Sequence, residues 1–242
     1  MDHKIKYINI NQSLCNIISN CKCNNCYSPI LNPKKIKYCE INRKYNKDCK
    51  ANNRLDIKLI DTLNNNKYEN VIIKNNLNVL NGLDFSKLLY IKNLSIYNLT
   101  SSNNLNYLNN SLNTLRCFDN ISFAPLDYLP LQLKILYIFD IFNKNLDKLP
   151  ILIKCLNLGI SFKQKVDNLP IYIYSLYLGI KSYFHDINNL PNSLTFASIY
   201  TTSTNITKLP ESLKHIVLYD DMYITGNTLK NIKHIQIKQY KN

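Results

Sequence analysis

The strongest constraint on the fold is a Leu-Pro pair that returns about every twenty residues in the second half of the chain. With the Leu of each pair taken as offset 0, the units begin at Leu129, Leu149, Leu169, Leu190 and Leu209. Each unit also carries apolar residues at offsets −3, +4, +7 and +9. A regular period of this length is typical of repeat proteins, in which each repeat packs on its neighbours.

The same pattern extends beyond the units that Leu-Pro marks. Units without the Pro begin at Lys87, Leu108 and Thr228, and VIIKN at 71–75 indicates a degraded unit. About eight repeats of 19–21 residues are therefore expected over residues 84–242.

The spacing of the last two apolar positions predicts a short strand in each unit. Offsets +7 and +9 are two residues apart, so their side chains point to one face while +6, +8 and +10 point to the other. One unit buries too little apolar surface to fold alone, so neighbouring strands must pair in parallel and cover each other's apolar rows. The Pro precedes the strand and removes no hydrogen bond from the sheet. An amphipathic helix with apolar residues at 0, +4 and +7 is the alternative, and this Pro and the +7/+9 alternation argue against it.

The expected fold is an α/β repeat solenoid, with short parallel strands on one side and mostly irregular return segments. The consensus LxxLPxxLxxLxL resembles leucine-rich repeats. More narrowly, FNKNLDKLP at 142–150, NLPNSL at 189–194 and KLPESLKHIVL at 208–218 resemble FNIP repeats, a leucine-rich-repeat variant of social amoebae and of giant DNA viruses that infect amoebae. The Phe-Asn that names the repeat is intact at Phe142-Asn143 and degraded at Phe162-Lys163.

That resemblance implies a leucine-rich-repeat horseshoe with strands on its concave face, a binding role, and no catalytic residue. Some relatives carry an F-box before the repeats, but residues 1–60 lack the Leu/Ile-rich helical segment that this domain needs. We therefore expect a binding protein that is not an enzyme, and a viral source is one that the resemblance implies. Whether it serves as a ubiquitin-ligase adaptor, as some relatives do, stays open.

The outward offsets predict a partner-binding face that is rich in aromatic residues. Together with Asn157, which we expect at the floor of a groove beside Cys155 and Gly159, the predicted contact residues are Tyr97, Phe118, Tyr137, Phe139, Tyr177, Phe196, Tyr200 and Tyr219. Such side chains give a large contact area for a protein partner at low entropic cost. The alternative is that they only stack on neighbouring strands, as good strand formers do.

Lysine residues recur at offset +5, beside the aromatic rows. The row consists of Lys92, Lys134, Lys154, Lys214 and Lys233. It forms either a basic edge to the binding face or a solvated row in a Lys-rich chain. His215 and His234 fall at +6 in successive units, where two surface histidines are a weak indication of a metal site.

The N-terminal residues 1–54 form a basic, Cys-rich region. Cys23 and Cys26 are spaced as in a zinc knuckle, and Cys39 and Cys49 could complete a tetrahedral site. One structural zinc, free thiols and disulfides are all open alternatives, and no other cofactor is indicated. Cys117, at an inward +9 position, is expected in the core.

The charge of the chain allows a second class of partner. The formal net charge is +14, of which residues 1–58 contribute +8, from twelve Lys and Arg against four Asp and Glu. Nucleic-acid binding through this basic head is thus the alternative to protein binding. Scarce Arg and abundant Lys, Asn and Ile are also what an AT-rich coding sequence supplies, which weakens that alternative.

The remaining segments complete the expected organisation. Residues 55–83 should hold a short capping helix, with Leu55, Leu59, Ile60 and Leu63 on one face, and the degraded first repeat. The first ten residues lack the apolar core of a signal peptide, and no apolar run is long enough to cross a membrane. An intracellular, cytoplasmic protein without membrane contact is therefore expected, in the host cytoplasm if it is viral.

Overall fold

The computed structural model divides the chain into two compact units, Met1–Ala124 and Pro125–Asn242. It describes residues 6–11, 28–30, 37–43, 60–61, 63–75, 84–97, 105, 108–118, 126–139, 141–159, 161–183, 187–201, 208–219 and 234–238. For 6–11, 28–30, 37–43, 73–75, 179–183, 200–201, 218–219 and 234–238 this description covers the backbone alone.

The first unit is a mostly parallel sheet. Its strands are β1 (Lys6–Asn11), β2 (Ser28–Ile30), β3 (Lys37–Arg43), β4 (Asn70–Asn75), β5 (Asn93–Tyr97) and β6 (Thr114–Phe118). They lie in the order β2-β1-β3-β4-β5-β6, and only the β1–β2 pair is antiparallel. Strands β1 to β3 fall within the Cys-rich region, where the repeat pattern predicts none.

Short helical segments connect part of this sheet. The 3₁₀ helix η2 spans Phe85–Lys87, and residues 60–61 and 63–65 are helical. Ile60 and Leu63 are buried there, while Leu55 and Leu59 lie outside the described residues. Asn64 links this segment to the next coil, where a coil means one repeat of the solenoid. Its side-chain nitrogen donates to the Lys87 carbonyl at 2.7 Å, and its side-chain oxygen accepts from the Leu89 N–H at 3.0 Å.

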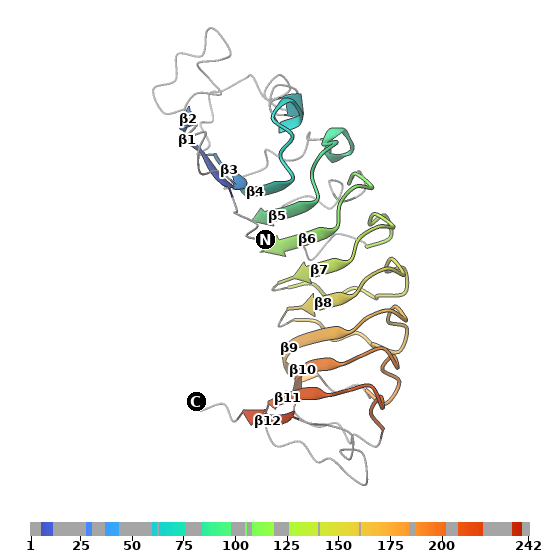
Figure 1. The fold of residues 1–242 in the computed structure, drawn as a ribbon. Coiled ribbons are helices and arrows are strands. Elements are labelled where there is room, and N and C mark those ends of the chain that lie inside the picture. Colours follow the sequence, from blue (N-terminus) through green and yellow to red (C-terminus); the bar gives the residue numbers. More distant parts are fainter. Residues whose placement is uncertain are drawn as a thin grey trace. The chain divides into compact units, whose positions relative to one another are not determined.

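The second unit is a stack of parallel strands in chain order. These are β7 (Ile135–Ile138), β8 (Cys155–Leu158), β9 (Ser175–Tyr183), β10 (Phe196–Thr201), β11 (His215–Tyr219) and β12 (His234–Lys238). Figure 1 shows them side by side, with the described return segments between them. The pairing follows the predicted offsets: Leu136 lies opposite Leu156, and Leu156 opposite Leu176. The predicted parallel repeat solenoid is therefore confirmed.

The core consists of the rows that the repeat pattern predicts to be inward. In β7 and β8, both the +7 and the +9 side chains are fully buried, as are Leu133 and Ile153 at +4. The alternation of buried and half-buried residues along Ile135–Ile138 shows that each strand presents one face to this core. Within the residues that the structure describes, no helix is both long and apolar enough to span a membrane.

The Pro of each unit lies in a turn that uses its carbonyl group. The Pro130 carbonyl accepts a hydrogen bond from the Leu133 N–H at 3.0 Å, and the corresponding bonds follow Pro150, Pro170, Pro191 and Pro210. The turn therefore needs no N–H at offset +1. Pro is tolerated because the group it lacks is not used, and its fixed φ restricts the unfolded chain.

The Phe-Asn pair stabilises the return segments, a role that the sequence pattern alone did not reveal. Phe142 and Phe162 are fully buried and stacked, with ring centroids 6.2 Å apart and planes at 2°. The Asn143 side-chain oxygen accepts hydrogen bonds from the Lys163 N–H at 2.8 Å and from Gln164 Nε2 at 3.0 Å. Phe packs successive coils together, and Asn pairs with polar groups of the next coil.

A row of hydrogen bonds, called the polar ladder, joins successive return segments. The side-chain oxygen of the residue at offset −2 accepts a hydrogen bond from the residue at offset −1 of the following unit. Lys148 Nζ donates to Asp127 at 3.0 Å, and Asn168 Nδ2 donates to Asp147 at 3.0 Å. Asp167 accepts from Asn189 at 3.4 Å, and Asn188 accepts from the Lys208 N–H at 2.8 Å. The Asp127 carboxylate also raises the pKa of Lys148. The ladder keeps exposed return segments in the same register as the strands.

The first prediction concerns the buried aromatic pair. Phe142→Ala should lower the free energy of unfolding by about 3–5 kcal/mol, because it leaves a cavity beside Phe162. The neighbouring Ile141, which is 42% exposed, provides the matched control: Ile141→Ala should change stability by less than about 1 kcal/mol. Urea denaturation followed by circular dichroism measures both. Equal losses in the two variants would contradict a packing role for Phe142.

Candidate functional site

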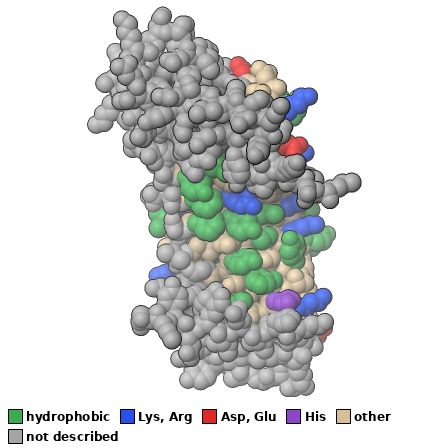
Figure 2. Space-filling view, turned by 60° about the vertical axis from the view of Figure 1, so that its left-hand side comes forward, with side chains coloured by type: hydrophobic (Ala, Val, Ile, Leu, Met, Phe, Trp, Pro, Cys, Tyr) green, Lys and Arg blue, Asp and Glu red, His purple; other side chains and the backbone are tan. Residues whose placement is uncertain are grey.

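The candidate site is the open face of the sheet, defined as the face that carries the +6, +8 and +10 side chains. In the second unit, Tyr137, Phe139, Asn157, Tyr177 and Phe196 are half-buried there, between residues that are fully buried on the other face. Figure 2 shows hydrophobic side chains gathered on the described part of this face, with Lys and Arg side chains beside them. The strand period alone places these groups together.

The aromatic side chains of the second unit form two pairs. The rings of Tyr137 and Phe139 are stacked, with centroids 6.2 Å apart, and those of Tyr177 and Phe196 are tilted by 38° at 5.0 Å. Both separations lie in the range of favourable aromatic contacts. The rings are therefore partly covered by one another and partly open to solvent, so stacking and exposure coexist on this face.

Asn157 lies between two tyrosines in the +8 row. The register places it opposite Tyr137 on one side and Tyr177 on the other. Asn is a shorter side chain than Tyr, so this position of the +8 row carries less side-chain bulk than its two neighbours; the groove floor expected here stays a prediction.

The expectation that Cys155 and Gly159 are exposed beside Asn157 is wrong. Both residues are buried, and Cys155 is only 6% exposed. The Cys155 thiol donates a weak hydrogen bond to the hydroxyl group of Tyr137, with the Sγ to Oη distance at 3.6 Å. The Tyr137 side chain reaches over the thiol, so Cys155 is not part of an exposed contact surface.

The first unit has its own aromatic pair on the open face. Tyr97 and Phe118, both at +10, are stacked with centroids 4.2 Å apart and planes at 7°. Ser95 and Thr114 on the same face are buried, and Arg116 is half-buried. Both rings are half-buried, like those of the pairs in the second unit.

Two predicted contact residues have only their backbone described. Tyr200 in β10 pairs with Tyr219 in β11, so both occupy the +10 row as expected. Their side chains are outside the described residues.

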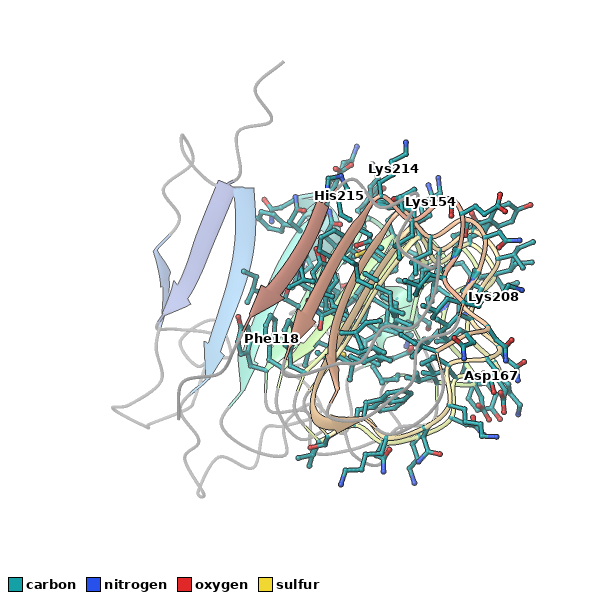
Figure 3. The ribbon with its side chains drawn as sticks, turned by 90° about the horizontal axis from the view of Figure 1, so that it is seen from below. Phe118, Lys154, Asp167, Lys208, Lys214 and His215 are labelled. Atoms are coloured by element: carbon teal, nitrogen blue, oxygen red, sulfur yellow. The ribbon has the colours of Figure 1, made fainter. Side chains whose placement is uncertain are left out.

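The lysines at +5 lie along the edge of the open face. Lys134, Lys154 and Lys214 are exposed just before β7, β8 and β11, and Figure 3 shows Lys154 and Lys214 at this edge, with His215 close to Lys214. Within the described residues, none of these three ammonium groups forms an ion pair. These three lysines therefore keep their positive charge un-neutralised by any described carboxylate, whereas Lys92, at +5 in the first unit, forms an ion pair with Glu69.

The predicted zinc site falls largely outside the described residues. Cys23, Cys26 and Cys49 lie there, while the backbone of Cys39 belongs to β3 and pairs with Ile8 and Val71. His234 pairs with His215 in register, but its side chain is not described. Among the side chains that are described, no three His, Cys, Asp or Glu groups come together.

Cys117 is a core residue, as predicted. It is fully buried, and desolvation raises the pKa of its thiol to about 12. Because the thiolate is the reactive form, this side chain is inert in the folded protein.

Sequence reasoning missed one group of exposed side chains. Leu131, Ile151 and Ile171, all at offset +2, are 71%, 55% and 61% exposed. The signal was present in the sequence, because three successive units carry an aliphatic residue immediately after the Pro.

Comparison with known proteins supports the architecture. No family model matches the sequence, and no curated protein does. Among solved structures, the chain is similar to CroV588, described as a novel circular LRR protein, at 22% identity and a TM-score of 0.50. The fold is that of a leucine-rich-repeat solenoid. The alignment covers 72% of this chain and 34% of CroV588, so the chain spans about a third of the length of that structure.

The second prediction concerns the two buried thiols. At pH 8, iodoacetamide should alkylate Cys117 and Cys155 far more slowly in the native leucine-rich-repeat chain than in urea, because both are buried. For Cys117 the raised pKa adds to this protection, since almost no thiolate exists four pH units below about 12. Peptide mass spectrometry measures each site separately. Native and unfolded rates that agree would show that this core is not closed.

Proposed function

We propose that this chain is a protein-binding module of FNIP-repeat type that uses the open face of its second unit. The proposal rests on one observation, the half-buried aromatic cluster around the shorter Asn157. The cluster consists of Tyr137, Phe139, Tyr177 and Phe196. A leucine-rich-repeat fold is typically used for protein interaction, and the likeness to CroV588 supports this choice at the level of fold.

The composition of the face suits a protein partner. Tyrosine and phenylalanine are rigid, give large apolar contact area and are enriched among residues that dominate binding energy. The lower position at Asn157 can receive one protruding partner side chain between Tyr137 and Tyr177. The exposed lysines at the edge favour a partner with acidic groups around its contact residues.

The role proposed here is recognition without catalysis. The sequence pairs no nucleophile with a base at recognisable spacing, and the aromatic face presents groups suited to contact. A structural zinc in the Cys-rich region would order the N-terminal segment and is independent of this face. Nucleic-acid binding through the +8 charge of residues 1–58 is the competing function.

The third prediction tests the aromatic face with a partner protein isolated from a cell lysate. A partner identified with the wild-type chain should bind the double variant Tyr137→Ala with Tyr177→Ala about a hundredfold more weakly, because two central aromatic contacts are lost. Titration calorimetry with the purified partner gives the affinities.

The matched control replaces two exposed tyrosines outside the open face, Tyr90→Ala with Tyr128→Ala. It should leave the affinity within about twofold. Nuclease treatment of the lysate should not release the partner. Partners that disappear with nuclease, or that bind equally to both double variants, would refute the proposed function and favour the basic head.

A further inference from the structure

A row of exposed aliphatic residues lies on the turns that precede the strands of the second unit. In each turn the Pro carbonyl accepts from the +4 N–H at 3.0–3.1 Å, so offsets +2 and +3 are the central turn residues. Leu131, Ile151 and Ile171 occupy +2 in three successive turns and are mostly exposed, as is Tyr172 at +3. These four residues are called the turn strip.

The fold does not require apolar residues at these positions. The same turn in the next two units carries Asn192 and Glu211 at offset +2, with the same hydrogen bond after Pro191 and Pro210. Central turn residues are usually polar because they face water. Isolated exposed apolar residues need no explanation, but a contiguous row of them marks an interaction site.

The spacing of the turn strip matches an α-helix laid along the stack. Neighbouring parallel strands are about 4.8 Å apart, so successive +2 residues repeat at nearly that distance. One turn of an α-helix rises about 5.4 Å, which brings residues i, i+4 and i+7 of an amphipathic helix over three successive coils with little mismatch. The strip is one or two residues wide, as is the apolar stripe of such a helix.

Charge on the two sides of the strip selects among possible occupants. Lys134 and Lys154 lie three residues beyond it at +5, and the carboxylates of the −2 row, including Asp167, lie on its other side. Figure 3 shows Lys154 and Asp167 on different sides of the coils. The +14 net charge opposes contact between two copies of this chain.

We propose that the turn strip docks one amphipathic α-helix of a partner protein, with acidic residues on the flank that meets Lys134 and Lys154. The apolar stripe of the helix covers Leu131, Ile151 and Ile171, and its carboxylates neutralise lysines that have no ion pair among the described residues. This site shares Lys134 and Lys154 with the edge of the open face, but its apolar contacts come from the turns and none from the aromatic cluster.

The test uses a synthetic helical peptide of three heptads with Leu at a and d and Glu along one flank. A matched peptide carries Lys in place of Glu. The protein variant Leu131→Asn, Ile151→Asn, Ile171→Asn copies the residue found at Asn192, so the turns should still form. Fluorescence anisotropy should show the acidic peptide binding the wild-type chain at least about tenfold more tightly than this triple variant.

Further variants assign the effect to the proposed contacts. Lys134→Gln with Lys154→Gln should abolish the preference for the acidic over the basic peptide, and added salt should weaken the wild-type complex. Tyr137→Ala with Tyr177→Ala should leave peptide binding unchanged, which separates this site from the open face. Circular dichroism and urea denaturation of the triple variant should match those of the wild type.

Three outcomes would overturn the proposal. Equal peptide affinity of a folded triple variant would remove the turn strip from the site. Binding of the wild-type chain to phosphatidylserine vesicles, lost in the triple variant while no peptide binds, would assign the strip to a lipid surface. A wild-type dimer that the triple variant converts to a monomer would assign it to a second copy of this chain.

Discussion

Each coil of this protein depends on the apolar surface of the next coil for its stability. Leu136, Leu156 and Leu176 pair in register on adjacent strands, and each is fully buried because its neighbours cover it. A single coil has one strand and one turn, which is too little to exclude water from its own side chains. The sheet, the buried Phe142–Phe162 pair and the polar ladders of the return segments all depend on this stacking in constant register.

The same constraint explains where the chain can vary and where it can bind. Inward positions are limited to residues that fill the core, whereas the described residues at +5, those at +2 in the Leu-Pro units, and part of the open face are exposed or half-buried and can change without loss of stacking. The open face uses this freedom for aromatic groups around Asn157, and the turns use it for Leu131, Ile151 and Ile171. Function in such a fold is carried by the positions that the repeat does not determine.

The sequence predicted the fold well because its signal is periodic. Offsets +7 and +9 identified Leu156 and Leu158 as buried, and Pro150 was correctly placed outside the strand. The burial of Cys155 could not be predicted, because it depends on how far the Tyr137 side chain reaches across from the neighbouring strand. Alternation gives the direction of a side chain but not the size of the groups that cover it.

Other features were missed because they have no repeat signal. Strands β1 and β3 lie in a polar segment that lacks the Leu-Pro spacing, yet β3 pairs with β4 and continues the parallel sheet of the first unit. The contribution of Asn143 depends on contacts with Lys163 and Gln164 of the following coil, which become visible only in three dimensions. The zinc ligands and the partner stay predictions, because the repeat period determines neither of them.

The central claim is that stability comes from stacking coils of constant length in register. It is tested most directly by comparing two deletions in the second unit by urea denaturation. Removal of 149–168 deletes one whole coil and joins Lys148 to Leu169 in phase, so the protein should fold cooperatively with a lower unfolding midpoint. Removal of 149–158 shifts every later offset by half a period, and this variant should fail to fold. Equal stability of the two deletion variants would contradict the account.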